Sequence, residues 1–178
     1  EMNYFEGFGG SGAVLFRKDP SPVEVYNDLE ENVYSLFKVL STDELFQQFK
    51  HRCDLTPYSK QLNTEFKSSL KGDLDISERD YQFFIVNRSS YNGDGGFSDS
   101  NVIRRNMSKS VSDFLSTIDR LPEIHQRLSK VIVQNDDALK LIKKYDQPNW
   151  LHYLDPPYHH STRTGARYKV DMGNDLQE

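Results

Sequence analysis

A glycine-rich stretch at residues 7–12 lies between two segments that favour β-strands, and it constrains the fold more than any other feature. Residues 2–6 predict a first strand, and residues 23–27 predict a second strand that Asp28 closes. The glycines match G-x-G-x-x-G, which permits a tight turn and a close approach of a ligand to the backbone. We expect a short helix over residues 13–18. An acid placed like Asp28 can accept hydrogen bonds from ribose hydroxyls.

A second strand-and-turn unit lies near the other end of the sequence. Residues 150–154 predict a short buried strand that runs into Asp155-Pro156-Pro157-Tyr158. Each proline fixes φ at about −65° and lacks an N–H, so few local donors compete for the carbonyls of Asp155 and Pro156. An acidic acceptor and an aromatic ring therefore flank a rigid turn. This arrangement suits a planar ligand that carries an amine.

Helices and loops fill the region between these units. Apolar spacing predicts a helix over residues 29–40, and residues 41–44 cap a further helix. Residues 77–80 resemble the start of a helix that continues over residues 81–86, and further helices are expected over residues 111–118 and 122–128. Apolar density falls from residue 50 to residue 128, and residues 87–97 indicate a flexible loop. Strand and helix alternate again over residues 130–134 and 138–144, with residues 135–137 as the cap. The sequence therefore predicts an α/β fold with residues 50–128 as an insertion.

Composition excludes several classes of protein. The 178 residues include one cysteine, Cys53, which excludes an internal disulfide and predicts a structural role for this thiol. No apolar run approaches the about 18 residues of a membrane span. No signal peptide is visible, and the single cysteine fits the reducing cytoplasm, where we expect the protein. The net charge of −5 argues against a wholly basic surface but allows a local basic face. Both ends look cut, and we expect a chain truncated at both.

The order of these motifs resembles that of the Dam-like (D12 class) DNA N6-adenine methyltransferases. In that family a Phe-x-Gly-x-Gly element binds S-adenosylmethionine, and the tetrapeptide at residues 155–158 is the catalytic motif. Gly7 stands where the family commonly has proline. The resemblance implies cofactor contacts from Glu6, Phe8, Gly10, Gly12, Asp28, Asp137 and Asp155.

The resemblance also implies a division of the chain and an architecture. Residues 1–49 would form the cofactor-binding part, residues 50–128 a mostly helical target-recognition insert, and residues 129–178 the catalytic part. The expected architecture is a Rossmann-like, S-adenosylmethionine-dependent methyltransferase sheet that carries this insert.

The family's chemistry gives the catalytic tetrapeptide its roles. Asp155 and the Pro156 carbonyl would accept the hydrogens of the adenine amine, and Tyr158 would stack on a base flipped out of duplex DNA. No metal is implied. We expect a monomer encoded by a bacterium or a phage, and the sequence leaves open whether a cognate restriction endonuclease accompanies it. The cations expected to contact DNA are Arg88, Arg104, Arg105, Lys109 and Arg163.

Other interpretations stay open at this point. On local grounds Asp28 and Asp137 fit turn residues or helix caps, and Arg104-Arg105 fits a solvated face. A dinucleotide-binding oxidoreductase would share the glycine loop, and it would bind NAD without binding S-adenosylmethionine. A catalytically inactive DNA-binding fragment would bind duplex without transferring a methyl group. A methyltransferase acting on RNA or on protein glutamine would share the chemistry, but the large insert favours duplex DNA.

Overall fold

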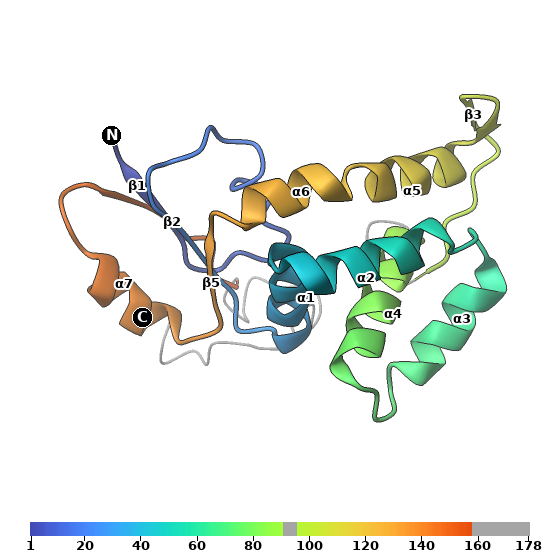
Figure 1. Cartoon of the computed structure of the whole chain (residues 1–178), viewed down its shortest axis with the longest axis horizontal. Coiled ribbons are helices and arrows are strands. Elements are labelled where there is room, and N and C mark those ends of the chain that lie inside the picture. The colour runs from blue at the N-terminus through green and yellow to red at the C-terminus, as the bar shows by residue number, and fades with distance from the viewer. Residues whose placement is uncertain (91–95, 158–178) are drawn as a thin grey trace. The chain divides into compact units, whose positions relative to one another are not determined.

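The computed structural model describes residues 1–90 and 96–157, which belong to two compact units. The first unit comprises Glu1–Tyr34 and Lys130–Glu178, and it holds a four-stranded sheet. The second unit, Ser35–Ser129, is mostly helical (Figure 1). Within the described residues, no helix is both long enough and apolar enough to cross a bilayer.

The sheet of the first unit is wholly parallel. Its order is β5-β2-β1-β6, and every neighbouring pair runs in the same direction. The strands are β1 (Asn3–Glu6), β2 (Glu24–Asn27), β5 (Ile132–Gln134) and β6 (Trp150–Tyr153). All four strands expected from the sequence are confirmed. The α/β class with a parallel sheet is confirmed with them.

The two faces of the sheet are covered by different segments. Phe5, Val25 and Leu141 form a buried apolar cluster with partly buried Tyr145 and Trp150, so α7 (Ala138–Tyr145) packs on the face that Phe5 and Val25 share. Alternate residues point to opposite faces of a strand, so Tyr4 lies on the other face. There the Lys18 ammonium lies 4.5 Å from the Tyr4 ring centroid. The connection between β1 and β2 therefore covers the face opposite α7.

The short helix expected over residues 13–18 is wrong, because turns occupy this segment. Phe16 N–H donates to Gly12 O at 3.0 Å, and Lys18 N–H donates to Val14 O at 3.0 Å. A helix becomes stable only when a continued series of i to i−4 hydrogen bonds offsets the free-energy cost of forming its first turn. Asp19 and Pro20 follow too soon for such a series to form.

The second unit contains a helical bundle and a small hairpin, and α1 enters it from the first unit. Its core includes Phe49 and Phe84, whose rings meet edge to face at 5.2 Å, and Phe114, which packs likewise against Tyr58. The elements are α1 (Glu31–Ser41), α2 (Asp43–Asp54), α3 (Lys60–Ser69), α4 (Ile76–Arg88), β3 (Ile103–Arg104), β4 (Met107–Ser108), α5 (Lys109–Asp119) and α6 (Leu121–Leu128).

Some helix boundaries differ from those expected. The second compact unit begins at Ser35, within α1. The helix whose start is expected at residues 77–80 begins at Ile76, because the Asp75 carboxylate accepts the N–H of Glu78 and caps it. At the start of α2, Thr42 occupies the cap position, but its hydroxyl donates to Lys38 O instead. The capping hydrogen bond expected there is absent from these described residues.

Candidate functional site

Four chain segments meet at one edge of the sheet. Because all strands are parallel, the loops that follow β1, β2, β5 and β6 leave the sheet at its carboxyl edge. The chain moves from β1 to β2 and β5 on one side, and then crosses over to β6 on the other side of β1. The strand order therefore reverses between β1 and β6. In parallel sheets, ligands bind at the carboxyl edge beside such a reversal.

The glycine loop after β1 is built around the ring of Tyr26. A Cβ added to Gly9 would lie 2.0 Å from Tyr26 Cε2, so only glycine fits there. The Tyr26 hydroxyl donates to Gly10 O at 2.5 Å. Gly10 and Gly12 have φ of +50° and +64°, a region that favours glycine. A Cβ at Gly10 would meet no atom within 4 Å, so this loop position faces open space.

Asp28 lies against this loop, which brings together two residues singled out from the sequence. Asp28 Oδ2 accepts the N–H of Gly10 at 2.6 Å, and Oδ1 accepts the N–H of Glu30 at 2.7 Å. The bond to Glu30 is the turn interaction expected on local grounds. The bond to Gly10 is a longer-range contact. Each carboxylate oxygen keeps a second acceptor lone pair, so Asp28 can still accept from a ligand.

Glu6 lies beneath the glycine loop. Its side chain is 1 % exposed, and Oε2 accepts from the Tyr4 hydroxyl at 2.6 Å and from Leu15 N–H at 3.1 Å. Burial raises the pKa of Glu6, while these two hydrogen bonds and Lys18 oppose that rise. The carboxylate therefore supports the return of the loop at Leu15.

The acid run after β5 acts through its backbone as well as its side chains. Asp137 caps α7, because its Oδ1 accepts Leu139 N–H at 2.7 Å, which confirms the local interpretation of this residue. Asp136 N–H donates to Asn27 Oδ1 at 2.9 Å, and Asn27 Nδ2 donates to Asp136 O at 3.0 Å. Asn27 is not among the residues singled out from the sequence. A polar residue ending a buried strand was the available signal.

The candidate catalytic residues follow β6 at the same edge. Glu6 pairs with Tyr153 in the β1–β6 register, and Gly7 N–H donates to Tyr153 O at 3.2 Å. Asp155 and Pro156 come directly afterwards and are exposed. The expected strand is thus confirmed, but its expected burial is wrong. Leu151 is 53 % exposed and Leu154 is 42 % exposed, because β6 is the last strand of the described sheet. The end of β6 lies beside the start of the glycine loop. Phe8, within that loop, is half-buried.

Two candidate site residues, Tyr158 and Arg163, lie outside the described residues. The loop expected at residues 87–97 is also described only in part. Among the described residues, no group of three or more histidine, cysteine or acidic side chains is placed to hold a metal ion.

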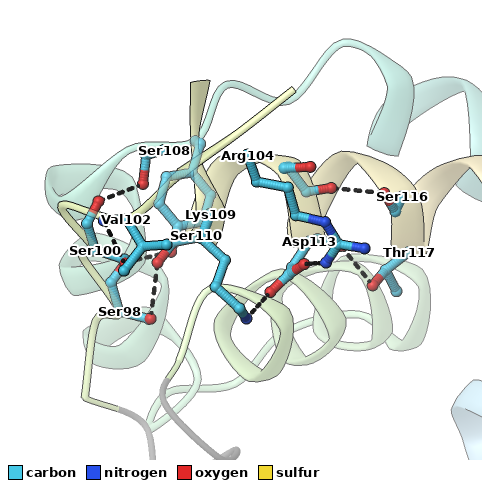
Figure 2. A network of polar contacts seen from close by, with 12 residues as sticks. Ser98, Ser100, Val102, Arg104, Ser108, Lys109, Ser110, Asp113, Ser116 and Thr117 are labelled. Carbon is cyan, nitrogen blue, oxygen red and sulfur yellow. Dashed lines mark hydrogen bonds and ion pairs between the residues drawn. The ribbon is translucent and has the colours of Figure 1, made fainter. Parts of the chain in front are cut away.

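Three of the candidate DNA-binding cations lie close together in the second unit, Arg104 and Arg105 in the hairpin and Lys109 at the start of α5. The turn of the hairpin places Arg105 and Asn106 at φ of 52° and 59°, the left-handed conformation that a tight hairpin turn requires. Arg104 and Lys109 both pair with Asp113, at 2.6 and 2.5 Å (Figure 2). The Lys109 ammonium holds the pKa of Asp113 below its usual value, and the Arg104 guanidinium adds a smaller effect in the same direction.

Two of these three cations, Arg104 and Lys109, thus share one acid, Asp113 of α5. Arg105 donates to the Ser116 hydroxyl at 3.0 Å and has no acid partner among the described contacts. The fourth candidate, Arg88, is exposed at the end of α4, with its guanidinium 5.8 Å from the Phe84 ring centroid.

The strand order, the glycine loop with its acid and the turn after β6 define a class of α/β protein that binds a nucleoside-containing ligand at the carboxyl edge of its sheet. A family model described as D12 class N6 adenine-specific DNA methyltransferase matches residues 1–178. The chain belongs to this family, and its substrate is DNA. A search of curated proteins found no match.

Proposed function

We propose that this protein transfers a methyl group from S-adenosylmethionine to the N6 amine of adenine in duplex DNA, after flipping the base out of the helix. The observation that carries the proposal is the adjacency of two loops. The turn that starts at Asp155 follows β6, and the glycine loop follows its neighbour β1 at the reversal of strand order. A methyl donor and an acceptor amine held by these loops would lie side by side.

The residues at the edge of the sheet fit the cofactor. S-adenosylmethionine has a ribose with two hydroxyl donors, and Asp28 retains acceptor capacity beside the loop. The open space above Gly10 would admit the ligand without a clash against a side chain. Gly12 and Phe8 would complete the loop contacts. Asp137 would contact the cofactor from the loop that follows β5. Glu6 would contribute by holding the glycine loop in place.

The turn after β6 would make the adenine amine nucleophilic. The lone pair of this amine is delocalised into the ring. The Asp155 carboxylate and the Pro156 carbonyl would accept its two hydrogens and favour tetrahedral nitrogen, placing acceptors where positive charge develops. When bound, S-adenosylmethionine supplies an electrophilic methyl group on a sulfonium sulfur. The chain's part in the reaction is to hold the amine in line with that methyl group.

The second unit would bind the DNA, in the role of a target-recognition region. Arg104 and Arg105 of the hairpin and Lys109 at the start of α5 carry more positive charge than Asp113 neutralises. Such groups bind phosphates and make affinity depend on salt. A base inside a duplex cannot reach a carboxylate at the end of a strand, so the base must leave the stack. Tyr158 would then stack on it, which is worth about 1–3 kcal/mol.

A binding and transfer experiment tests the proposal. Calorimetry should detect binding of S-adenosylmethionine and not of NAD. Incubation of the protein with methyl-labelled cofactor and duplex DNA should then give labelled N6-methyladenine, identified by mass spectrometry after digestion. Label on cytosine, on RNA or on protein, or binding of NAD alone, would refute it.

A further inference from the structure

Asn27 joins the loops on both sides of its own strand. It is the last residue of β2, and it is completely buried. Its Nδ2 donates to Gly7 O, at the start of the glycine loop after β1, at 3.0 Å. The same Nδ2 donates to Asp136 O at 3.0 Å, and Oδ1 accepts Asp136 N–H at 2.9 Å. One side chain therefore fixes the backbone of two loops that belong to the neighbouring strands β1 and β5.

Only a side-chain amide satisfies all three of these backbone groups. Asparagine has two N–H donors and one carbonyl acceptor at this reach, and the three contacts use both donors and the acceptor. A carboxylate would turn an oxygen toward the carbonyls of Gly7 and Asp136, which also accept. An apolar side chain would leave buried polar groups without partners.

The backbone around Asn27 continues the same connection toward the ligand edge. Asn27 O accepts Gly9 N–H at 2.9 Å, and the next residue, Asp28, accepts Gly10 N–H. The end of β2 thus holds the glycine loop at three successive points, Gly7, Gly9 and Gly10. On the other side it holds Asp136, next to the cap residue Asp137.

We propose that Asn27 is a positioning residue for S-adenosylmethionine, setting the spacing between the glycine loop and Asp136-Asp137 while touching neither cofactor nor DNA. This inference rests on the proposed function. A small error in the spacing of positioned groups is costly to binding and rate. Loss of the bridge is therefore expected to weaken cofactor binding by about tenfold or more, since unpaired buried groups strain both loops. Binding of DNA by the hairpin of the second unit is expected to change less than about twofold, because the three hydrogen bonds of the Asn27 side chain all lie within the first unit.

The substitution Asn27→Asp tests the positioning role through a pH-dependent change in cofactor affinity. A general loss of stability would not produce that pH dependence. Burial, together with the acids Asp28 and Asp136, favours the protonated form of the introduced carboxyl at low pH. Protonated, it donates to one of the two carbonyls, and ionised it repels both. The cofactor affinity of the variant, relative to wild type, should therefore be lower at pH 8 than at pH 6. Asn149→Asp makes the same change at an exposed position before β6, at the opposite edge of the sheet, and should match wild type at both pH values.

Calorimetry with S-adenosylmethionine at the two pH values, anisotropy with duplex DNA, and thermal unfolding in the same buffers complete the test. A variant affinity equal to wild type at both pH values, or an equal loss of cofactor and DNA binding, would overturn the inference. If Asn27→Asp is unfolded at pH 8, Asn27→Ser, which keeps one donor, must show the same selective loss of cofactor binding. Failure of wild type to bind S-adenosylmethionine would instead refute the proposed function.

Discussion

Replacing Gly9 by alanine tests how the glycine loop is built. The added Cβ would lie 2.0, 2.4 and 2.6 Å from three atoms of the Tyr26 ring. Carbon atoms pack best at about 3.5–4.0 Å, so the ring or the loop must move by about 1.5 Å. Tyr26 is completely buried, and its hydroxyl is held by Gly10 O. We therefore expect the full cost of overpacking, about 1–3 kcal/mol of unfolding free energy.

Gly10→Ala provides the matched control. Its Cβ would enter open space, so its cost is the backbone cost of a left-handed alanine, about 1–2 kcal/mol. The two variants differ in their coupling to Tyr26. In a double-mutant cycle, Tyr26→Leu should restore about 1 kcal/mol or more of the unfolding free energy that Gly9→Ala removes, because the smaller side chain no longer clashes with the added Cβ. In the cycle of Gly10→Ala with Tyr26→Leu there is no such clash, so no such recovery is expected.

Urea unfolding measures these free energies, and calorimetry with S-adenosylmethionine measures the consequence for the site. Gly9→Ala should displace the loop and weaken the cofactor by about tenfold or more. If the Gly9→Ala and Tyr26→Leu effects are simply additive, the loop is not built on the Tyr26 ring, and the description of the site is wrong.

Three further predictions concern catalysis, DNA binding and pH. Asp155→Ala should abolish methyl transfer in a labelled-cofactor assay while duplex affinity stays within about twofold, and retained transfer would contradict the proposed role. Replacing Arg104 and Arg105 together by alanine should lower the slope of log affinity against log salt by about 2, whereas an identical slope would place the DNA elsewhere. Burial raises the pKa of Asp80 to about 6, and Ser35 donates to its carboxylate. The native state therefore holds the Asp80 proton more tightly than the unfolded chain does. The contribution of this group to the unfolding free energy is fully present below about pH 4 and is lost as the pH rises through about 6. Asp80→Asn should raise stability at pH 8 by about 1–2 kcal/mol, and an unchanged denaturation midpoint would count against a buried charge there.

The sheet and its ligand edge were predictable because they depend on local patterns. Short apolar segments that end in glycine or an acid mark the strands, and parallel α/β order then brings their ends together. The adjacency of Gly10 and Asp28 follows from this logic without knowledge of any side-chain contact.

Other features were beyond sequence patterns because they depend on long-range contacts. The contacts of Asn27 lie 20 and 109 residues away, so no spacing rule reveals them. Helix α3 has one buried residue, Asn63, and a polar composition, which leaves little apolar periodicity to detect. Residues 13–18 have helix-forming side chains, but Lys18 donates to Ser21 and pairs with Glu24, which favours a compact turn.

The most direct measurement of the central claim is the methylation state of DNA in cells that express the gene. The host should lack N6-adenine methylation of its own, and its DNA should be sequenced by a method that detects the modified base. We expect N6-methyladenine at one recurring sequence, and we expect it to be absent when Asp155→Ala replaces the wild type. Unmodified adenine in both strains, with the protein folded and bound to S-adenosylmethionine, would contradict it.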